Sequence, residues 1–125
     1  MAKHRAWRSR FGRAAERHTE QLLTRAGLRV IERRFRRAGG EIDLIALDND
    51  GELVFVEVKA RCSDRYGAPL EAVDLHKQRR LGRVAGAFLR QYDGPYRSAR
   101  FDVVSLQADG RGSLVSDWVR DAFRI

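Results

Sequence analysis

The chain has 125 residues, of which 43% are hydrophobic and 34% are charged, and its formal net charge is +8 at pH 7. This composition is typical of one globular domain and excludes a disordered chain. The longest apolar runs are too short to span a bilayer and no apolar leader core follows the N-terminus, so we expect a cytoplasmic protein without a membrane partner. The single cysteine, Cys62, excludes an internal disulfide and fits a reducing compartment.

The positive charge is concentrated in the first third of the chain. Residues 1–37 contain 12 Lys and Arg against 3 Asp and Glu, whereas the remainder is nearly balanced. A polyanion is therefore the expected partner, nucleic acid before an anionic membrane. We expect residues 1–10 to form a basic arm outside a single domain at 11–125. For this arm a solvated and partly disordered tail, a nucleic-acid contact and an organellar transit segment all stay open.

The first half of the chain predicts one helix and three strands. Apolar residues at three- and four-residue steps predict a helix over 9–26, which Gly27 ends. Strands are predicted at 28–35, 41–47 and 52–60. The turn sequence Asp-Asn-Asp-Gly at 48–51 joins the second and third strands as a hairpin.

The second half alternates in the same way. A second amphipathic helix is predicted over 74–92 and a fourth strand over 100–106. Leu114 and Val115 predict a short fifth strand, and the residues around 118–123 suggest a closing helical turn. The order helix-strand-strand-strand-helix-strand predicts an α/β fold with a mixed sheet.

The third predicted strand carries charge where a strand normally carries apolar residues. Side chains at 53, 55, 57 and 59 share one face and those at 54, 56 and 58 the other. Apolar residues on both faces predict a central strand that is covered on both sides. Glu57 and Lys59 at its end are therefore costly unless they are paired, bind a metal ion or face a cleft.

The hairpin register brings a second carboxylate to this position. With a loop of 49–51, Asp43 lies across from Glu57, and the Cβ atoms of opposed residues are about 5 Å apart. Two carboxylates at this distance can share a divalent cation, and oxygen ligands favour Mg²⁺ or Mn²⁺. Such an ion activates water and neutralises charge on a phosphodiester. The alternative is a solvated surface ion pair between Lys59 and Glu57.

These motifs resemble a known family. An Asp on one strand and Glu-x-Lys on the next are similar to the PD-(D/E)xK nucleases, which have a restriction-endonuclease-like fold. Gly12-x-x-Ala15-Glu16, the stretch 40–46, the stretch 54–61 and Arg100-Phe101-Asp102-Val103-Val104 resemble the YraN family of bacterial proteins, as do Tyr66-Gly67, Ala72-Val73-Asp74 and Lys77. That family is regarded as distantly related to archaeal Holliday junction resolvases. Ile42 replaces the proline of the motif name, and Arg34 stands where the family's first strand is expected to have asparagine.

The resemblance implies a role for each matching residue. Asp43 and Glu57 would bind the metal ion together with the Val58 carbonyl. Lys59 would orient the attacking water or stabilise the pentacovalent phosphate. Glu16 would complete the site from the first helix, with an exposed helix acid as the alternative. Resolvase-like relatives meet the symmetry of a four-way junction with a two-fold dimer, so a homodimer is also expected.

The expected activity is hydrolysis of DNA phosphodiesters, including branched or repair intermediates. The candidate phosphate contacts are all basic side chains, each of which could equally be a solvated surface charge: Arg8, Arg10, Arg13, Arg17, Arg61 and Lys77. The rival hypothesis is a non-catalytic nucleic-acid-binding protein that retains the fold. A membrane-surface protein fits less well, because the basic arm lacks a strong apolar face.

Overall fold

The computed structural model describes residues 2–61, 74–108, 111 and 113–124, and for residues 2–11, 61 and 108 the backbone path alone. Its elements are, in chain order, α1 (Ala2–Arg25), β1 (Arg29–Arg37), β2 (Gly40–Leu47), β3 (Glu52–Arg61), α2 (Leu75–Gln91), β4 (Ser98–Ala108) and β5 (Leu114–Phe123). The expected α/β fold, with the order helix-strand-strand-strand-helix-strand, is confirmed. Cys62 and the motif residues at 66–67 and 72–73 lie outside the described residues.

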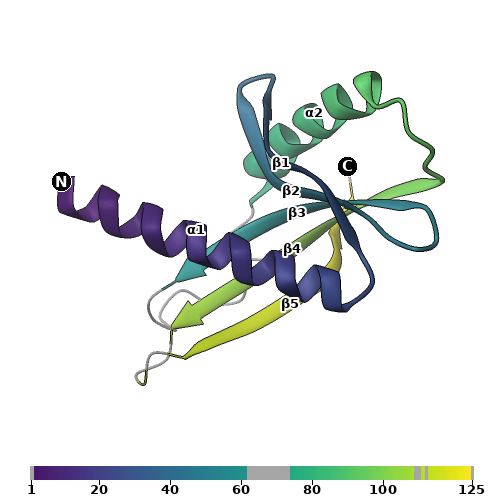
Figure 1. Ribbon diagram of the computed structural model, residues 1–125. Helices are drawn as coiled ribbons and strands as arrows, with labels where there is room; N and C mark the ends of the chain where they lie inside the picture. The colour runs from purple at the N-terminus through teal and green to yellow at the C-terminus, as the bar shows by residue number, and fades with distance from the viewer. Residues whose placement is uncertain (1, 62–73, 109–110, 112, 125) are drawn as a thin grey trace.

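The five strands form one mixed sheet in the order β1-β2-β3-β4-β5, with α1 on one face and α2 on the other (Figure 1). Strand β3 pairs in parallel with β4, and the other neighbours are antiparallel. A parallel pair needs a crossover connection, and α2 lies in it. Neither described helix is long and apolar enough to cross a membrane.

Strand β3 is the central strand, as its two apolar faces predicted. Its Leu53 and Phe55 pack in the core beneath α2, with Phe88 of that helix. Val54 and Val56 pack in the second core, beneath α1. All four of these β3 side chains are at most 2% exposed, so the strand that carries Glu57 and Lys59 is held firmly between two layers.

Local signals fix the ends of both helices. After α1, the Leu28 amide donates to the Leu23 carbonyl and the Gly27 amide to the Thr24 carbonyl, with Gly27 at φ 90°. This is the Schellman arrangement, and Leu28 and Leu23 share a core cluster as it requires. Helix α2 begins after Asp74, whose carboxylate accepts from the Lys77 amide at 2.8 Å.

Two segments differ from the sequence-based expectation. Helix α1 begins at Ala2, so its backbone includes the residues expected as a separate arm. A fifth strand does begin at Leu114, but it runs on to Phe123 as β5, paired with β4, so the predicted closing helical turn was wrong. The pairing shifts near the end of β5, where the four steps from Val119 to Phe123 face the two steps from Phe101 to Val103. This irregularity, at which Asp121 has φ 52°, changes the face, since Trp118 packs in the core beneath α1 and Ala122 in the core beneath α2.

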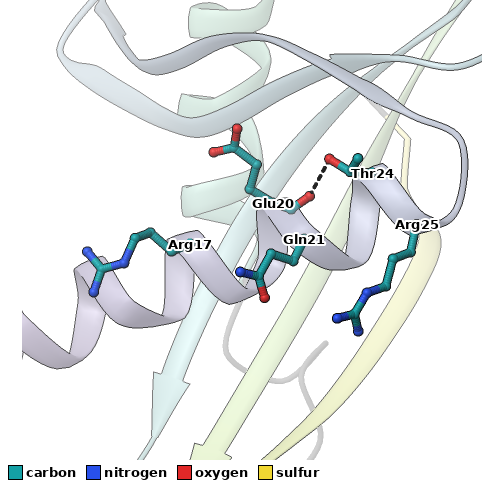
Figure 2. A pocket seen from close by; sticks show the side chains of 5 residues that line it. All are labelled: Arg17, Glu20, Gln21, Thr24 and Arg25. Carbon is teal, nitrogen blue, oxygen red and sulfur yellow. Dashed lines mark hydrogen bonds between the residues drawn. The ribbon is translucent and has the colours of Figure 1, made fainter.

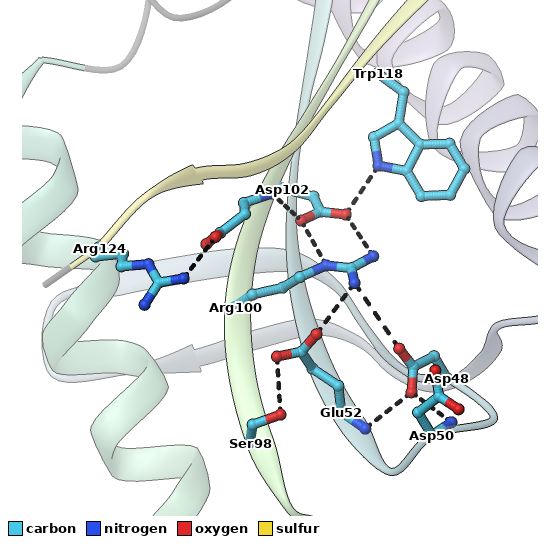
Figure 3. A network of polar contacts seen from close by, with 9 residues as sticks. Asp48, Asp50, Glu52, Ser98, Arg100, Asp102, Trp118 and Arg124 are labelled. Carbon is cyan, nitrogen blue, oxygen red and sulfur yellow. Dashed lines mark hydrogen bonds and ion pairs between the residues drawn. The ribbon is translucent and has the colours of Figure 1, made fainter.

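The motif at 100–102 builds a buried polar network (Figure 3). The Asp102 side chain is 0% exposed and accepts from Arg100 Nε at 3.0 Å, from Trp118 Nε1 at 2.8 Å and from the Asp121 amide at 2.9 Å. Arg100 also contacts Glu52 at 3.1 Å. This acid therefore joins β3, β4 and β5, and its hydrogen-bond capacity is used inside the fold.

Candidate functional site

The site lies where β2 and β3 separate, and the hairpin turn sets its register. The Asp48 carboxylate accepts from the Asp50 and Glu52 amides at 2.8 and 2.9 Å and so closes the loop. The strand pairing then runs to Leu44 opposite Val56, which is the predicted register. The next step along each strand reaches the two acidic residues of the site.

Asp43 continues the ladder with its side chain. Its Oδ2 accepts from the Val58 amide at 2.8 Å, in place of a backbone carbonyl. Asp43 also shares a hydrogen bond with the carboxyl group of Glu57, which is only 9% exposed. The structure therefore brings the two predicted carboxyl groups together, and the backbone of β3 fixes the orientation of one of them.

Burial raises the pKa of Asp43 to about 8, and the charge and hydrogen bond of Glu57 act in the same direction. The Val58 amide opposes this shift but does not cancel it. Two carboxylates held together away from water repel, so the pair retains a proton at neutral pH. A divalent cation between them would remove this repulsion and displace the proton.

Two lysines border the carboxyl pair. Lys77, near the start of α2, places Nζ 3.5 Å from Glu57 Oε1. Lys59 is half-buried and contacts Lys77 rather than forming an ion pair with Glu57. The geometry therefore differs from the surface ion pair that was the alternative for Lys59. Lys77, expected only as a phosphate contact, is part of the site itself.

Burial also lowers the pKa of Lys59 to about 8, and the neighbouring Lys77 lowers it further, against the opposing charges of Glu57 and Asp43. An amine whose pKa lies near neutrality exchanges its proton readily. It can also donate to a phosphate oxygen while charged. Both properties suit a group beside a reacting phosphodiester.

The oxygen ligands of the site fit a hard cation that takes only a few of its ligands from the protein. Among the described residues, no group of three or more His, Cys, Asp and Glu side chains is placed to hold a metal ion. Asp43 and Glu57 supply two carboxylates, and the Val58 carbonyl lies on the same strand. Mg²⁺ commonly binds through one or two carboxylates and completes its shell with water and substrate phosphate. These residues therefore fit Mg²⁺ or Mn²⁺.

Glu16 approaches the carboxyl pair from α1, and Arg34 of β1 forms an ion pair with it. The negative charge of Glu16 makes a small contribution to the raised pKa of Asp43. Arg34 pairs with Glu16 at 3.0 Å. On β1 it lies between Arg33, which pairs with Leu44, and Phe35, which pairs with Ile42, so it is level with Asp43 on β2. Sequence reasoning gave Arg34 no role. The one sequence signal for a special position was the asparagine expected there. Asparagine tolerates the left-handed backbone that Arg34 adopts, with φ 52°.

The other predicted contacts are spread around the site. Arg13 and Arg17 are exposed on α1. The side chains of Arg8, Arg10 and Arg61 lie outside the described residues. The basic residues in and around the site thus come from α1, β1, β3 and α2.

Comparison with known proteins gives one consistent family. Residues 15–106 match the model of the uncharacterised protein family UPF0102, which is the YraN family expected from the motifs. A UPF0102 protein of Symbiobacterium thermophilum is 46% identical over 114 residues, which cover 91% of this chain and 96% of the relative. A UPF0102 protein of Alcanivorax borkumensis is 42% identical over 113 residues, covering 90% of each chain.

A solved structure, that of Pyrococcus furiosus SfsA in complex with Ca²⁺, is 13% identical, with a TM-score of 0.39. The similarity covers 91% of this chain and 64% of that chain. The matched family segment, 15–106, includes every residue of the site described above.

Proposed function

We propose that this chain, which belongs to the UPF0102 family, is a metal-dependent endonuclease that hydrolyses DNA phosphodiesters, including branched or repair intermediates. The observation that supports this most strongly is the shared position of Asp43 and Glu57, with Asp43 fixed by the Val58 amide at 2.8 Å. A protein that only binds nucleic acid has no need for two carboxylates beside a phosphate backbone. Their mutual repulsion is accounted for if a cation binds between them.

The chain's own residues would divide the work. Asp43, Glu57 and the Val58 carbonyl would hold Mg²⁺ or Mn²⁺, which supplies an activated water and neutralises charge on the phosphate. Lys59 would orient the water or stabilise the charge that develops on the phosphorus oxygens. Lys77, which pairs with Glu57 in the absence of metal, would contact a phosphate of the substrate. Glu16, which Arg34 orients, would complete the site from α1.

The second candidate is a non-catalytic nucleic-acid-binding protein with the same fold. It is favoured by the ion pair between Glu16 and Arg34, which engages the third acid of the site. In this case the site would bind phosphate through Lys59 and Lys77 without cleaving it. The single cysteine suits a reducing compartment such as the cytoplasm in either case.

The test is single-turnover cleavage of single-strand, duplex, flap and four-way-junction DNA with Mg²⁺, Mn²⁺ or EDTA. Lys59→Ala and Asp43→Asn should abolish cleavage and leave DNA affinity within a few-fold. Arg90→Ala and Asp93→Asn, at exposed positions away from the site, are the charge-matched controls. Cleavage at the wild-type rate in Lys59→Ala and Asp43→Asn would remove the assignment. Tight binding without cleavage by the wild type would favour the second candidate.

Assembly is a separate measurement. We propose a homodimer, because its two catalytic sites could then cut the two strands of a four-way junction. Light scattering of the protein alone and with junction DNA checks this. A monomer in both samples would exclude junction resolution by a dimer and leave a simple nuclease.

A further inference from the structure

A row of exposed polar residues runs along α1. Arg13, Arg17, Gln21 and Arg25 follow one another at intervals of four residues, and all four side chains are exposed. Figure 2 shows Arg17, Gln21 and Arg25 projecting from one side of the helix, whereas Glu20 projects from the other. Each interval rises about 6 Å along the helix, so the four residues form a stripe about 18 Å long. We call these four residues the α1 stripe.

The charge of the α1 stripe is not compensated within the described part of the chain. Arg13, Arg17 and Arg25 have no hydrogen bond or ion pair to any described side chain. The neighbouring arginines of β1 behave differently, because Arg33 pairs with Glu20 and Arg34 with Glu16. Arg13 and Arg17 are one turn apart without partners and repel each other, and an external anion would relieve this repulsion.

The stripe borders two hollows in the surface beside α1. One hollow of about 420 Å³ reaches from Arg17 to Arg25. A second, of about 300 Å³, includes Glu16 and Leu44. The two hollows share Arg17 and Glu20, so they adjoin each other along α1.

We infer that the α1 stripe binds the phosphodiester backbone of one DNA strand, which runs lengthwise along α1 beside the two hollows. The interval of about 6 Å between successive members is comparable with the separation of successive phosphates along a strand. Arginine binds phosphate oxygens through two parallel N–H groups, and Gln21 supplies a neutral donor within the row. That the bound strand is the substrate of the carboxyl site rests on the proposed function, whereas the binding itself does not.

A strand is a better occupant than a lipid surface. The residues that line the first hollow between the arginines are Gln21, Thr24 and Glu20, which are polar. A helix that lies on a membrane needs an apolar face beside its basic residues, and the apolar face of α1 is buried against the sheet. Acidic headgroups therefore serve as the comparison in the test.

The first experiment removes the stripe. The variant Arg13→Gln/Arg17→Gln/Arg25→Gln is compared with Arg90→Gln/Arg97→Gln/Arg124→Gln, which removes the same charge from exposed positions elsewhere. Binding of a fluorescent DNA oligonucleotide is titrated with salt in EDTA, so that no cleavage occurs. The slope of log affinity against log salt should become shallower by about two to three units in the stripe variant only. Affinity at 0.1 M salt should fall by about tenfold or more.

The second experiment completes the stripe. Gln21→Arg adds one cation to the row, and Gln91→Arg adds the same charge at an exposed position on α2. Gln21→Arg should tighten DNA binding and steepen the slope by about 0.7–0.9 units, and Gln91→Arg should do neither. Circular dichroism of each variant checks that the helices are intact.

The outcomes separate this inference from the nuclease assignment. A stripe variant that keeps the wild-type slope, or loses no more than the control triple, would overturn the inference even if the protein cleaves DNA. Loss of binding to phosphatidylserine vesicles with unchanged DNA binding would overturn it in favour of a membrane. A shallower slope in the stripe variant supports the inference even if the wild type cleaves nothing, and then only the nuclease assignment fails.

Discussion

Arg34 directs two nitrogen atoms at a single oxygen of Glu16, with Nε 3.1 Å and Nη2 3.0 Å from Oε2. The other carboxylate oxygen, Oε1, accepts no hydrogen bond from the described residues, although the charge of Glu16 reaches Asp43. Arg34 therefore leaves half of this carboxylate available to the site. It does so from a left-handed backbone conformation with φ 52°, which costs an L-residue other than glycine or asparagine about 1–2 kcal/mol.

The backbone at Arg34 gives a first prediction. Arg34→Asn should change the free energy of unfolding by less than about 0.5 kcal/mol, because the relief of backbone strain offsets the loss of an exposed ion pair. Arg34→Val loses the same ion pair but adds a β-branched side chain at a positive φ. It should be less stable than Arg34→Asn by about 1–2 kcal/mol. Urea denaturation of the three proteins checks this, and equal stability of the two variants would contradict it.

The carboxyl pair predicts how stability depends on pH without metal. The folded state retains a proton on Asp43 up to a pKa of about 8, whereas the unfolded chain loses it near 3.8. The folded state then binds more protons than the unfolded state across this window, so the Asp43 contribution to stability falls as pH rises from about 4 to about 8. Lys59, with its pKa lowered to about 8 from 10.5, contributes the opposite slope between these values.

Asp43→Asn should remove the first slope. Its melting temperature in EDTA should exceed that of the wild type increasingly between pH 5 and pH 8, because the amide cannot ionise. Mn²⁺ should raise the melting temperature of the wild type at pH 8 and leave that of Asp43→Asn nearly unchanged. Parallel melting curves for the two proteins from pH 5 to pH 8 would exclude the raised pKa. Asp93→Asn, exposed and distant, is the control.

Asp102 predicts the largest loss of stability outside the site. Asp102→Ala leaves Arg100, whose side chain is 17% exposed, without its closest anion, and also leaves Trp118 Nε1 without its acceptor. Breaking a buried ion pair from one side costs about 3–5 kcal/mol. Urea denaturation followed by tryptophan fluorescence measures this. Asp117→Ala, at an exposed position on β5, is the control and should stay within about 0.5 kcal/mol of the wild type.

The sequence predicted the site as far as local geometry determines it. The turn at 48–51 and the alternation of β3 were enough to place Asp43 beside Glu57, because a hairpin turn fixes its register. The β5 segment was misread, since a bulge removes the alternation by which a strand is recognised. Such a bulge depends on the pairing with β4, which is a tertiary contact.

Arg34 and Lys77 show what a sequence cannot give alone. The asparagine expected at position 34 was the one sequence signal there, and it predicted neither the φ of 52° at Arg34 nor the ion pair with Glu16. Lys77 reaches Glu57 only because α2 packs beneath β3, 18 or more residues after that strand's acid in the chain. Its role could be predicted as phosphate binding from charge. Its contact with the carboxyl pair required the packing of the helix.

That contact gives the last prediction, in which metal and DNA respond in opposite directions. Lys77 Nζ lies 3.5 Å from Glu57 Oε1, so it competes with a cation for this carboxylate. Lys77→Met should therefore tighten Mn²⁺ binding, by about three- to tenfold for the removal of one neighbouring charge. The same variant should weaken DNA binding, because one phosphate contact is lost. Arg79→Met removes an exposed charge from the same helix and should leave the metal affinity unchanged. Calorimetric titration with Mn²⁺ and a salt titration with DNA measure the two effects. Weaker Mn²⁺ binding in Lys77→Met would instead mean that Lys77 holds Glu57 in the orientation that binds the ion.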